Sequence, residues 1–310
     1  VLPSDCDADG RPEIYVANDS NANLLYRLTG AGALEDLSLL SGAAYSASGL
    51  EQAGMGIGGG DYDDDGDFDL VVSNFQHDYG TVYRNEGGCS FLDVTPEVGL
   101  AGPTYPYMAW AALLADFDSD TDLDLFIANG HIYPQVDTAG FEPFGQSDQL
   151  FLNRLRETGD AGFELAPEGG GPALTRTASS RAAAFGDFDD DGDLDLAVSY
   201  IDEPPALLVN EAAAPRHPML RVTLVGRAAN RSAQGARIEV TSGGLAQRVE
   251  LRHGDGYLGS NDPRRLFALP SGRAQGLRID WPGGGTTELR DIVPGWVVIH
   301  QGKGIVARKP

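Results

Sequence analysis

Residues 187–195 read Asp-Phe-Asp-Asp-Asp-Gly-Asp-Leu-Asp, and close copies of this stretch occur at 5–13, 61–69 and 116–124. We number these acidic loops 1 to 4 in chain order, and the positions within each loop from one to nine. The carboxylates crowded into nine residues repel one another unless a cation lies among them, so each copy predicts a metal-binding loop. Alternate carboxylates plus one carbonyl suit the large, flexible coordination shell of Ca²⁺ better than the tight octahedron of Mg²⁺.

We assign side-chain ligands to positions one, three, five and nine, and a backbone carbonyl to position seven. The candidate ligands are Asp5, Asp7, Asp9, Arg11 and Glu13 in loop 1; Asp61, Asp63, Asp65, Asp67 and Asp69 in loop 2; Asp116, Asp118, Asp120, Asp122 and Asp124 in loop 3; and Asp187, Asp189, Asp191, Asp193 and Asp195 in loop 4. Position six is glycine except in loop 3, where Thr121 stands, so we expect the third site to be the weakest or the most strained.

Two other interpretations of the loops are less favoured. An EF-hand needs a Glu at position twelve and flanking helices, whereas strand-like segments such as Leu70-Val71-Val72 follow these loops. A solvated acidic turn could explain any single copy, but four copies in one register argue against it.

The loops recur every 55 to 70 residues or so, and a period near fifty with several short strands per unit indicates β-propeller blades. The second unit shows the plan, with expected strands at 55–60, 70–74, 81–85 and 91–95. Tyr83-Arg84-Asn85 in this unit has counterparts at matching places after the other loops. Segments 131–146 and 156–172 are rich in Gly, Pro and Glu, and we predict that they are surface loops.

Two stretches that run into these loops, and a third that ends a blade, resemble known sequences. Ala184-Phe185-Gly186-Asp187 and Gly58-Gly59-Gly60-Asp61 resemble the FG-GAP/VCBS repeats of integrin-type β-propellers. Phe91-Leu92-Asp93-Val94-Thr95-Pro96-Glu97-Val98-Gly99-Leu100 resembles the blade ending of the branch that includes cartilage acidic protein and the UnbV proteins. The resemblance covers residues 1–213 and implies Ca²⁺ in the acidic loops, about four ions here.

The family's usual number of blades is about seven, so four repeats predict an incomplete propeller whose other blades lie upstream. We also expect no room for an inner strand before Asp5, and hence an N-terminus that is processed, truncated or completed by another subunit.

The composition changes after Pro215. Residues 216–310 hold 15 of the 22 Lys and Arg but 7 of the 46 Asp and Glu, a net charge of +8, which leaves −32 on residues 1–215. This asymmetry predicts a second, small β-rich domain at 216–310, with strands at 220–225, 236–241, 247–251, 276–280 and 296–300. Its opposite charge predicts docking on the acidic segment, in the same chain or between chains.

Several landmarks of this segment resemble the ASPIC/UnbV domain. They are Asn230-Arg231, Gly235-Ala236-Arg237, Gly256-Tyr257-Leu258-Gly259-Ser260-Asn261-Asp262 and Leu277-Arg278-Ile279-Asp280-Trp281-Pro282-Gly283-Gly284. One landmark departs, because Leu266-Phe267-Ala268-Leu269-Pro270 stands where the family usually has His-Phe-Gly-Leu-Gly.

The Ca²⁺ concentration that the loops require and the composition of the chain indicate where the protein is located. Loops of this type match millimolar extracellular Ca²⁺, so we expect a secreted or periplasmic protein. No apolar run approaches twenty residues, so no membrane span is expected. Cys6 and Cys89 could form a disulfide or remain two unpaired thiols.

Other chemistry is sparse in the sequence. His77, His131, His217, His253 and His300 lack metal-ligand spacing, no nucleophile motif is visible, and the arginines form no basic run that would suggest nucleic acid. We therefore favour a protein- or glycan-binding adhesion module. The alternatives are a structural subunit that assembles with copies of itself, and a propeller lyase or dehydratase acting on sugars.

Overall fold

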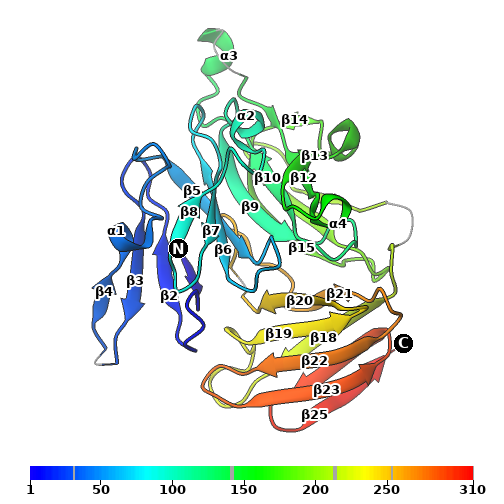
Figure 1. The fold of residues 1–310 in the computed structure, drawn as a ribbon. Helices are drawn as coiled ribbons and strands as arrows, with labels where there is room; N and C mark the ends of the chain where they lie inside the picture. The colour runs from blue at the N-terminus through cyan, green and yellow to red at the C-terminus, as the bar shows by residue number, and fades with distance from the viewer. Residues whose placement is uncertain (31, 140–142, 212–214, 253, 310) are drawn as a thin grey trace.

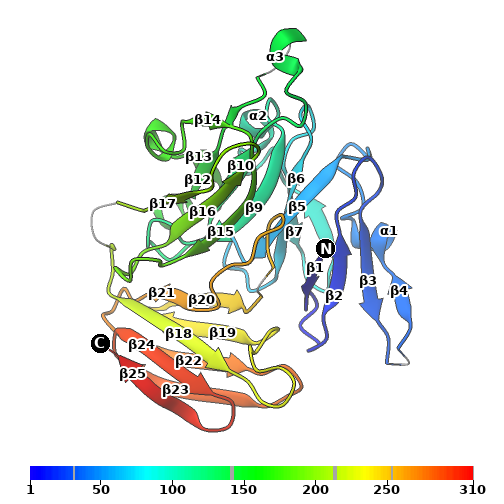
Figure 2. The ribbon, with the colours of Figure 1, turned by 180° about the vertical axis from the view of Figure 1, so that it is seen from behind.

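The computed structural model describes residues 1–30, 32–139, 143–211, 215–252 and 254–309. The described chain is nearly all β, as the sequence predicts. Four small sheets, formed in chain order, stand side by side as propeller-type blades, and a pair of stacked sheets lies across one end of them (Figures 1 and 2). No helix in the described residues is long and apolar enough to cross a membrane.

The first two blades are four-stranded antiparallel meanders. Blade 1 contains β1 (Leu2–Ser4), β2 (Glu13–Val16), β3 (Leu24–Leu28) and β4 (Leu34–Asp36), and blade 2 contains β5 (Gly54–Gly60), β6 (Asp69–Asn74), β7 (Thr81–Asn85) and β8 (Phe91–Asp93). The strands expected in the second unit are confirmed. The expectation of no inner strand before Asp5 is wrong, because β1 pairs with β2 in the register Leu2↔Tyr15. The three residues of β1 are enough for an inner strand, because its partner β2 has only four residues.

Blade 3 follows the same four-stranded plan, and blade 4 has three strands within the described residues. Blade 3 contains β9 (Ala109–Ala115), β10 (Asp124–Asn129), β12 (Gln149–Asn153) and β13 (Phe163–Leu165), and blade 4 contains β15 (Ser180–Gly186), β16 (Asp195–Tyr200) and β17 (Ala206–Leu208). Short helices α1 (Ser38–Ser41), α2 (Ala101–Thr104), α3 (Val136–Ala139), α4 (Leu155–Thr158) and η1 (Pro167–Gly170), and the strand pair β11 (Gln146–Ser147) and β14 (Thr177–Ala178), lie between the blade strands.

Segment 156–172 is not a pure surface loop, which corrects the prediction. It supplies β13, the fourth strand of blade 3, and Phe163 on this strand is buried against Tyr62 of loop 2. The Gly and Glu content of the segment concealed this strand. Residues 140–142 of segment 131–146 lie outside the described residues.

Small residues on the inner strands let the blades pack closely. A Cβ added to Gly56 would lie 2.0 Å from the carbonyl oxygen of Trp110, and one added to Gly58 would lie 2.8 Å from that of Ala112. The glycine run of β5 therefore brings blade 2 against β9 of blade 3. Apolar side chains fill each junction between blades, such as Val82 with Leu125 and Ile127 between blades 2 and 3.

The C-terminal segment forms a β-sandwich. One sheet has the order β21 (Arg265–Ala268), β18 (Met219–Val225), β24 (Gly295–His300) and β25 (Gly304–Lys309), with β18 and β24 parallel. The other has the order β20 (Leu245–Glu250), β19 (Arg237–Ser242), β22 (Ala274–Asp280) and β23 (Thr286–Ile292). Alternate residues of the two sheets, including Val222, Ile238 and Ile279, form one buried core. All five expected strands are present, and β21, β23 and β25 were not anticipated.

The sandwich docks on the blades through the loop at 254–262, the orange trace beside β5 in Figure 2. Gly256 and Ile57 of β5 exchange two backbone hydrogen bonds of 2.7 and 3.1 Å, and Asp262 N donates to Phe185 O of β15 at 3.0 Å. The ring of Tyr257 lies 5.0 Å from that of Trp110 on β9. The docking predicted from the charge asymmetry is therefore present within a single chain.

Candidate metal centre

The nine-residue loops fold so that distant positions converge. In loops 1 to 3 the oxygens of positions one, three and nine lie within 4.8 Å of one another, as in the group Asp61, Asp63 and Asp69. In loop 4, Asp195 at position nine accepts a hydrogen bond from Phe188 N at 2.9 Å, the same bond that Asp69 accepts from Tyr62 N at 3.1 Å in loop 2. The predicted ligands at these positions are brought together by the local backbone.

Two left-handed residues give each loop its shape. Position four has φ between 61° and 63° in Ala8, Asp64, Ser119 and Asp190, which sequence reasoning missed. Position six has φ of 89°, 97° and 104° at the glycines Gly10, Gly66 and Gly192, and 91° at Thr121. Glycine adopts this conformation freely, whereas a β-branched residue there is strained. In loops 1 to 3 the position-six N–H then donates to Oδ2 of position one at 2.9 to 3.1 Å.

Arg156 of α4 holds the strained residue of loop 3. Its Nε donates to Thr121 Oγ1 at 2.7 Å, and its guanidinium also pairs with Asp64 of loop 2. Loop 3 therefore has the same backbone as the others despite lacking the glycine. Whether its site is weaker stays a prediction.

Position nine is a buried anchor that links neighbouring blades. Asp69 Oδ1 accepts a hydrogen bond from Asn85 N at 2.8 Å, and the side chain of Asn85 donates back to Cys6 O in loop 1 at 2.9 Å. The same clamp recurs from Asn153 to Tyr62 O at 2.8 Å and from Asn210 to Phe117 O at 2.9 Å. The recurring asparagine after loops 2, 3 and 4 was the sequence signal for this contact. In blade 1, Leu28 stands at the place of the asparagine, and Arg27, the counterpart of Arg84, pairs with Asp7 and Glu13 at 2.6 and 3.2 Å.

Burial of the loop carboxylates is energetically unfavourable unless a cation is bound. It raises the pKa of Asp61 to about 7, of Asp69 to about 9 and of Asp193 to about 7, because desolvation disfavours the charged form. Six loop carboxylates also have a buried Oδ1 without a hydrogen-bond partner: Asp5, Asp61, Asp118, Asp122, Asp187 and Asp193. Unpartnered buried oxygens are unfavourable, and ligation of a cation removes the penalty. The residues present therefore fit a hard metal ion.

The outer positions are more open than the inner ones. Asp9, Asp65 and Asp191 at position five and Arg11 at position seven are exposed at the rim, as is Asp189. Asp67 is half-buried. Loop 3 differs, because Asp120 and Asp122 are buried and meet Glu157 of α4 within 4.8 Å. Glu157 lies 35 residues or more from its partners in sequence, so the motif alone could not reveal it.

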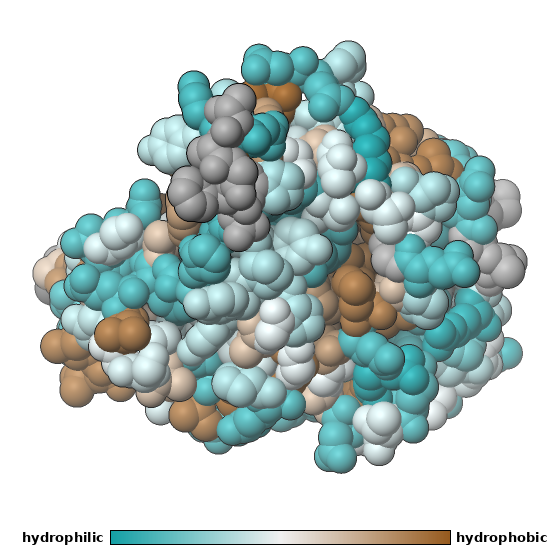
Figure 3. All heavy atoms as spheres, turned by 90° about the horizontal axis from the view of Figure 1, so that it is seen from above, coloured by the Kyte–Doolittle hydropathy of each residue, from teal (hydrophilic) through white to brown (hydrophobic). Residues whose placement is uncertain are grey.

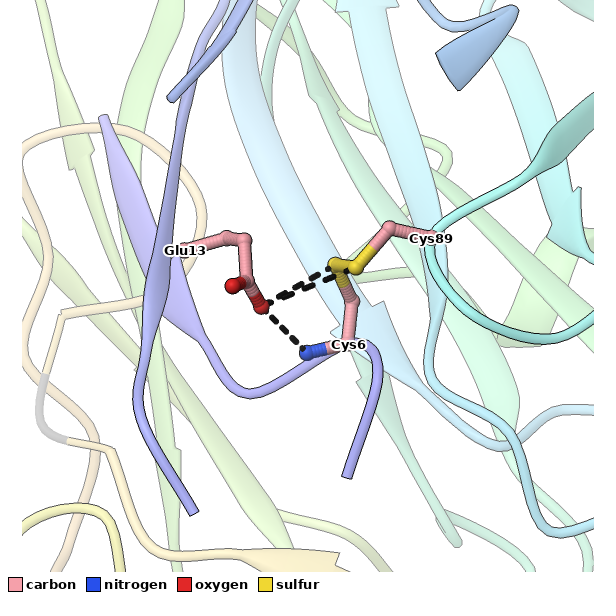
Figure 4. A group of neighbouring side chains, drawn as sticks. All are labelled: Cys6, Glu13 and Cys89. Atoms are coloured by element: carbon pink, nitrogen blue, oxygen red, sulfur yellow. Dashed lines mark hydrogen bonds between the residues drawn. A yellow bond between two sulfur atoms is a disulfide. The ribbon is translucent and has the colours of Figure 1, made fainter. Parts of the chain in front are cut away.

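Loop 1 is tied to blade 2 by a disulfide between Cys6 and Cys89, with a Cα–Cα distance of 5.2 Å (Figure 4). Glu13 at position nine accepts a hydrogen bond from Cys6 N at 3.2 Å, and the same oxygen lies 3.5 Å from Cys6 Sγ. Of the two alternatives left open by the sequence, the structure contains the disulfide. These sulfurs are therefore not available as thiolate metal ligands.

An arginine from the sandwich segment reaches each acidic loop. The ion pairs are Arg237 with Asp5 at 2.9 Å, Arg248 with Asp61 at 3.4 Å, Arg216 with Asp118 at 2.6 Å, and Arg221 with Asp187. Net charge predicted the attraction but not these pairs, because partners far apart in sequence meet only after docking. The loops and the sandwich enclose a cavity of about 310 Å³ lined by Asp5, Asp61, Arg237, Arg248 and Arg252, among others.

Comparisons with known proteins agree with these features. The family model for the FG-GAP-like repeat matches residues 5–72 and 61–127, and the model for ASPIC and UnbV matches residues 226–303. Cartilage acidic protein 1 of Homo sapiens is 26% identical over 280 residues, which is 88% of this chain and 39% of that protein. The Xenopus tropicalis protein of the same name is 27% identical over 283 residues, 88% of this chain and 40% of that one. The chain thus spans about 40% of the length of these relatives.

One solved structure concerns recognition of non-reducing terminal N-acetylglucosamine by an Agrocybe aegerita lectin. It is 19% identical, with coverage of 67% of this chain and 51% of that chain. The TM-score is 0.34, too low to indicate a shared fold.

Proposed function

Because this chain joins FG-GAP-like repeats to an ASPIC and UnbV domain, we propose that it is an extracellular Ca²⁺-binding module that acts by binding a protein or glycan. The buried carboxylate oxygens that lack a partner in all four acidic loops are the observation that carries the metal-binding part. About four Ca²⁺ ions would be held by the aspartates of positions one, three, five and nine, with Glu13 in loop 1, and by the position-seven carbonyls. Bound ions would rigidify the hairpin that each loop connects.

Ca²⁺ is therefore expected to stabilise the fold. An ion that binds only the folded state adds about 2.7 kcal/mol per site at a hundredfold excess over its dissociation constant. Thermal unfolding in EDTA, in millimolar Ca²⁺ and in millimolar Mg²⁺ tests this, and we expect a large rise in Tm with Ca²⁺ and a small one with Mg²⁺. Superimposable curves in EDTA and Ca²⁺ would contradict the metal-binding part.

An oxidising, Ca²⁺-rich compartment suits both the loops and the Cys6–Cys89 disulfide. Secretion, or export to a periplasm, is accordingly part of the proposal. The proposal also includes a division into a repeat domain at 1–213 and a β domain at 216–310, each with its own apolar core.

We assign partner binding to the end of the blades away from the sandwich. This end is largely hydrophilic with scattered apolar patches (Figure 3). Tyr105 follows α2 and is 48% exposed, and Tyr133 follows β10 and is 57% exposed. The Tyr105 ring lies 5.4 Å from the ring of His77, in the segment after β6, and the Tyr133 ring lies 5.8 Å from that of His131. Exposed aromatic rings are favourable contacts at protein interfaces.

A glycan array and a pull-down, each with Ca²⁺ and with EDTA, test this assignment. The double variant Y105A/Y133A should lose at least tenfold in binding, while the control L39A, at a 74% exposed site on α1 of blade 1, should bind normally. Equal binding by the two variants would contradict the assignment.

The two alternatives gain less support. The Arg181 guanidinium lies 4.1 Å over the Trp110 ring and donates to the carbonyl oxygens of Gly130 and His131, so this cation is engaged in packing rather than open to a substrate. Four arginines of the sandwich segment pair with acidic loops of their own chain, so these four are not available for a head-to-tail contact between chains.

A further inference from the structure

In each acidic loop, one carboxylate has a partner for one of its two oxygens and none for the other. In Asp5, Asp61, Asp118 and Asp187, Oδ2 pairs with an arginine of the sandwich segment. In the same four residues, Oδ1 is buried and has no hydrogen-bond partner. The divided carboxylate is at position one in loops 1, 2 and 4 and at position three in loop 3. The arginines come from different places: Arg237 on β19, Arg248 on β20, Arg221 on β18 and Arg216 before β18.

The arginines are themselves held in place. Arg248 on β20 faces Glu239 on β19 in a cross-strand pair, and its Nε lies 2.9 Å from Glu239 Oε2. The remaining Nη1 reaches Asp61 Oδ2 at 3.4 Å. In loop 4, Arg221 is 12% and Asp187 1% exposed at the side chain, so water screens this pair little.

These contacts have two opposing effects on a cation. The arginine charge repels it, but each loop carries four to six carboxylates and remains strongly anionic with one of them paired. The arginine also fixes the carboxylate through Oδ2, which in loops 1 and 2 accepts the position-six N–H as well, and Oδ1 is left for the cation. Groups that orient a ligating carboxylate from outside the coordination shell change metal affinity by roughly 10- to 100-fold when they are removed. We judge the orienting effect to be the larger one.

We propose that Arg216, Arg221, Arg237 and Arg248 are positioning residues for the metal loops, so that cation binding in the blades and docking of the sandwich strengthen each other. This inference rests on the proposed Ca²⁺ binding and adds the residues that couple it to the second domain. Coupling between two binding events is reciprocal. The sandwich should therefore raise the affinity of the loops, and filled loops should hold the sandwich more tightly.

Arg248 gives the cleanest test, because it is partly exposed and its loop has the full motif. R278Q is the matched control: Arg278 lines the same cavity and carries the same charge, but it pairs with Asp280 and Glu288 of the sandwich at 2.8 and 3.2 Å. In calorimetric titration of the full chain with Ca²⁺, R248Q should weaken one site by about tenfold or more, and R248K should restore part of the loss. R278Q should titrate like the unmodified chain.

Hydrogen exchange gives the reciprocal readout. The amides of Gly256 and Asp262, which donate to the blades, should exchange faster in EDTA than in Ca²⁺. An R248Q chain that binds Ca²⁺ as tightly as R278Q, or more tightly, would overturn the positioning role while leaving Ca²⁺ binding intact. An unmodified chain that does not bind Ca²⁺ would instead overturn the proposed function and this inference with it.

Discussion

Gly259 allows a sharp test of how the sandwich is attached to the blades. A Cβ added there would lie 2.1 Å from the carbonyl oxygen of Ala183 on β15, and the next nearest atom is the carbonyl carbon at 3.2 Å. Both are backbone atoms of an inner strand, so they cannot move aside as a flexible side chain could. The loop at 254–262 would have to lift, which would strain the hydrogen bonds from Gly256 to Ile57 and from Asp262 to Phe185.

Overpacking of this kind costs about 1–3 kcal/mol, and we expect G259A to lie in that range. The matched control is G254A in the same loop, because a Cβ added to Gly254 would meet no atom within 4 Å. Urea unfolding at fixed Ca²⁺ gives the change in the free energy of unfolding. Hydrogen exchange at Gly256 and Asp262 shows whether the docking contact has opened.

We expect G259A to lower the free energy of unfolding and to speed exchange at these two amides. G254A should change the free energy of unfolding by no more than about 0.5 kcal/mol and leave the exchange rates unchanged. If G259A were as stable and as well protected as G254A, the close contact with β15 would not hold the sandwich, and the docking described above would be wrong.

Two further predictions concern buried strain and buried charge. T121G should be more stable than T121A by about 1 kcal/mol, because both variants lose the hydrogen bond from Arg156 Nε to Thr121 Oγ1 and only glycine relieves φ of 91°. Equal urea midpoints of the two variants would show that loop 3 is unstrained. Burial raises the pKa of Asp148 to about 6, so the folded state binds its proton more tightly than the unfolded state. This group therefore contributes stability below about pH 4 that is lost as the pH rises to about 6. D148N should reduce the decline in the free energy of unfolding between pH 4 and pH 7 by up to about 3 kcal/mol.

The acidic loops were predictable because their determinants are local. The hydrogen bond from Gly66 N to Asp61 and the bond from Tyr62 N to Asp69 both close within nine residues. Their spacing in sequence therefore sets their geometry in space. The same holds for the short strands beside the loops, whose apolar residues match the buried faces of β6 and β10. Glycines at position six were identifiable because only a sharp turn requires them there.

What surrounds the loops was decided by tertiary structure. Arg248 lies 187 residues from Asp61, and Arg237 lies 232 residues from Asp5, so their pairing depends on how the sandwich docks. Glu157 and β13 were hidden in a segment whose composition is typical of a loop, and they are ordered by packing against blade 3. Net charge gave the sign of the attraction between the two segments. Only the docked geometry selects which carboxylate oxygen each arginine takes and which remains for a cation, because that choice depends on distances of a few ångströms between groups that the chain does not connect locally.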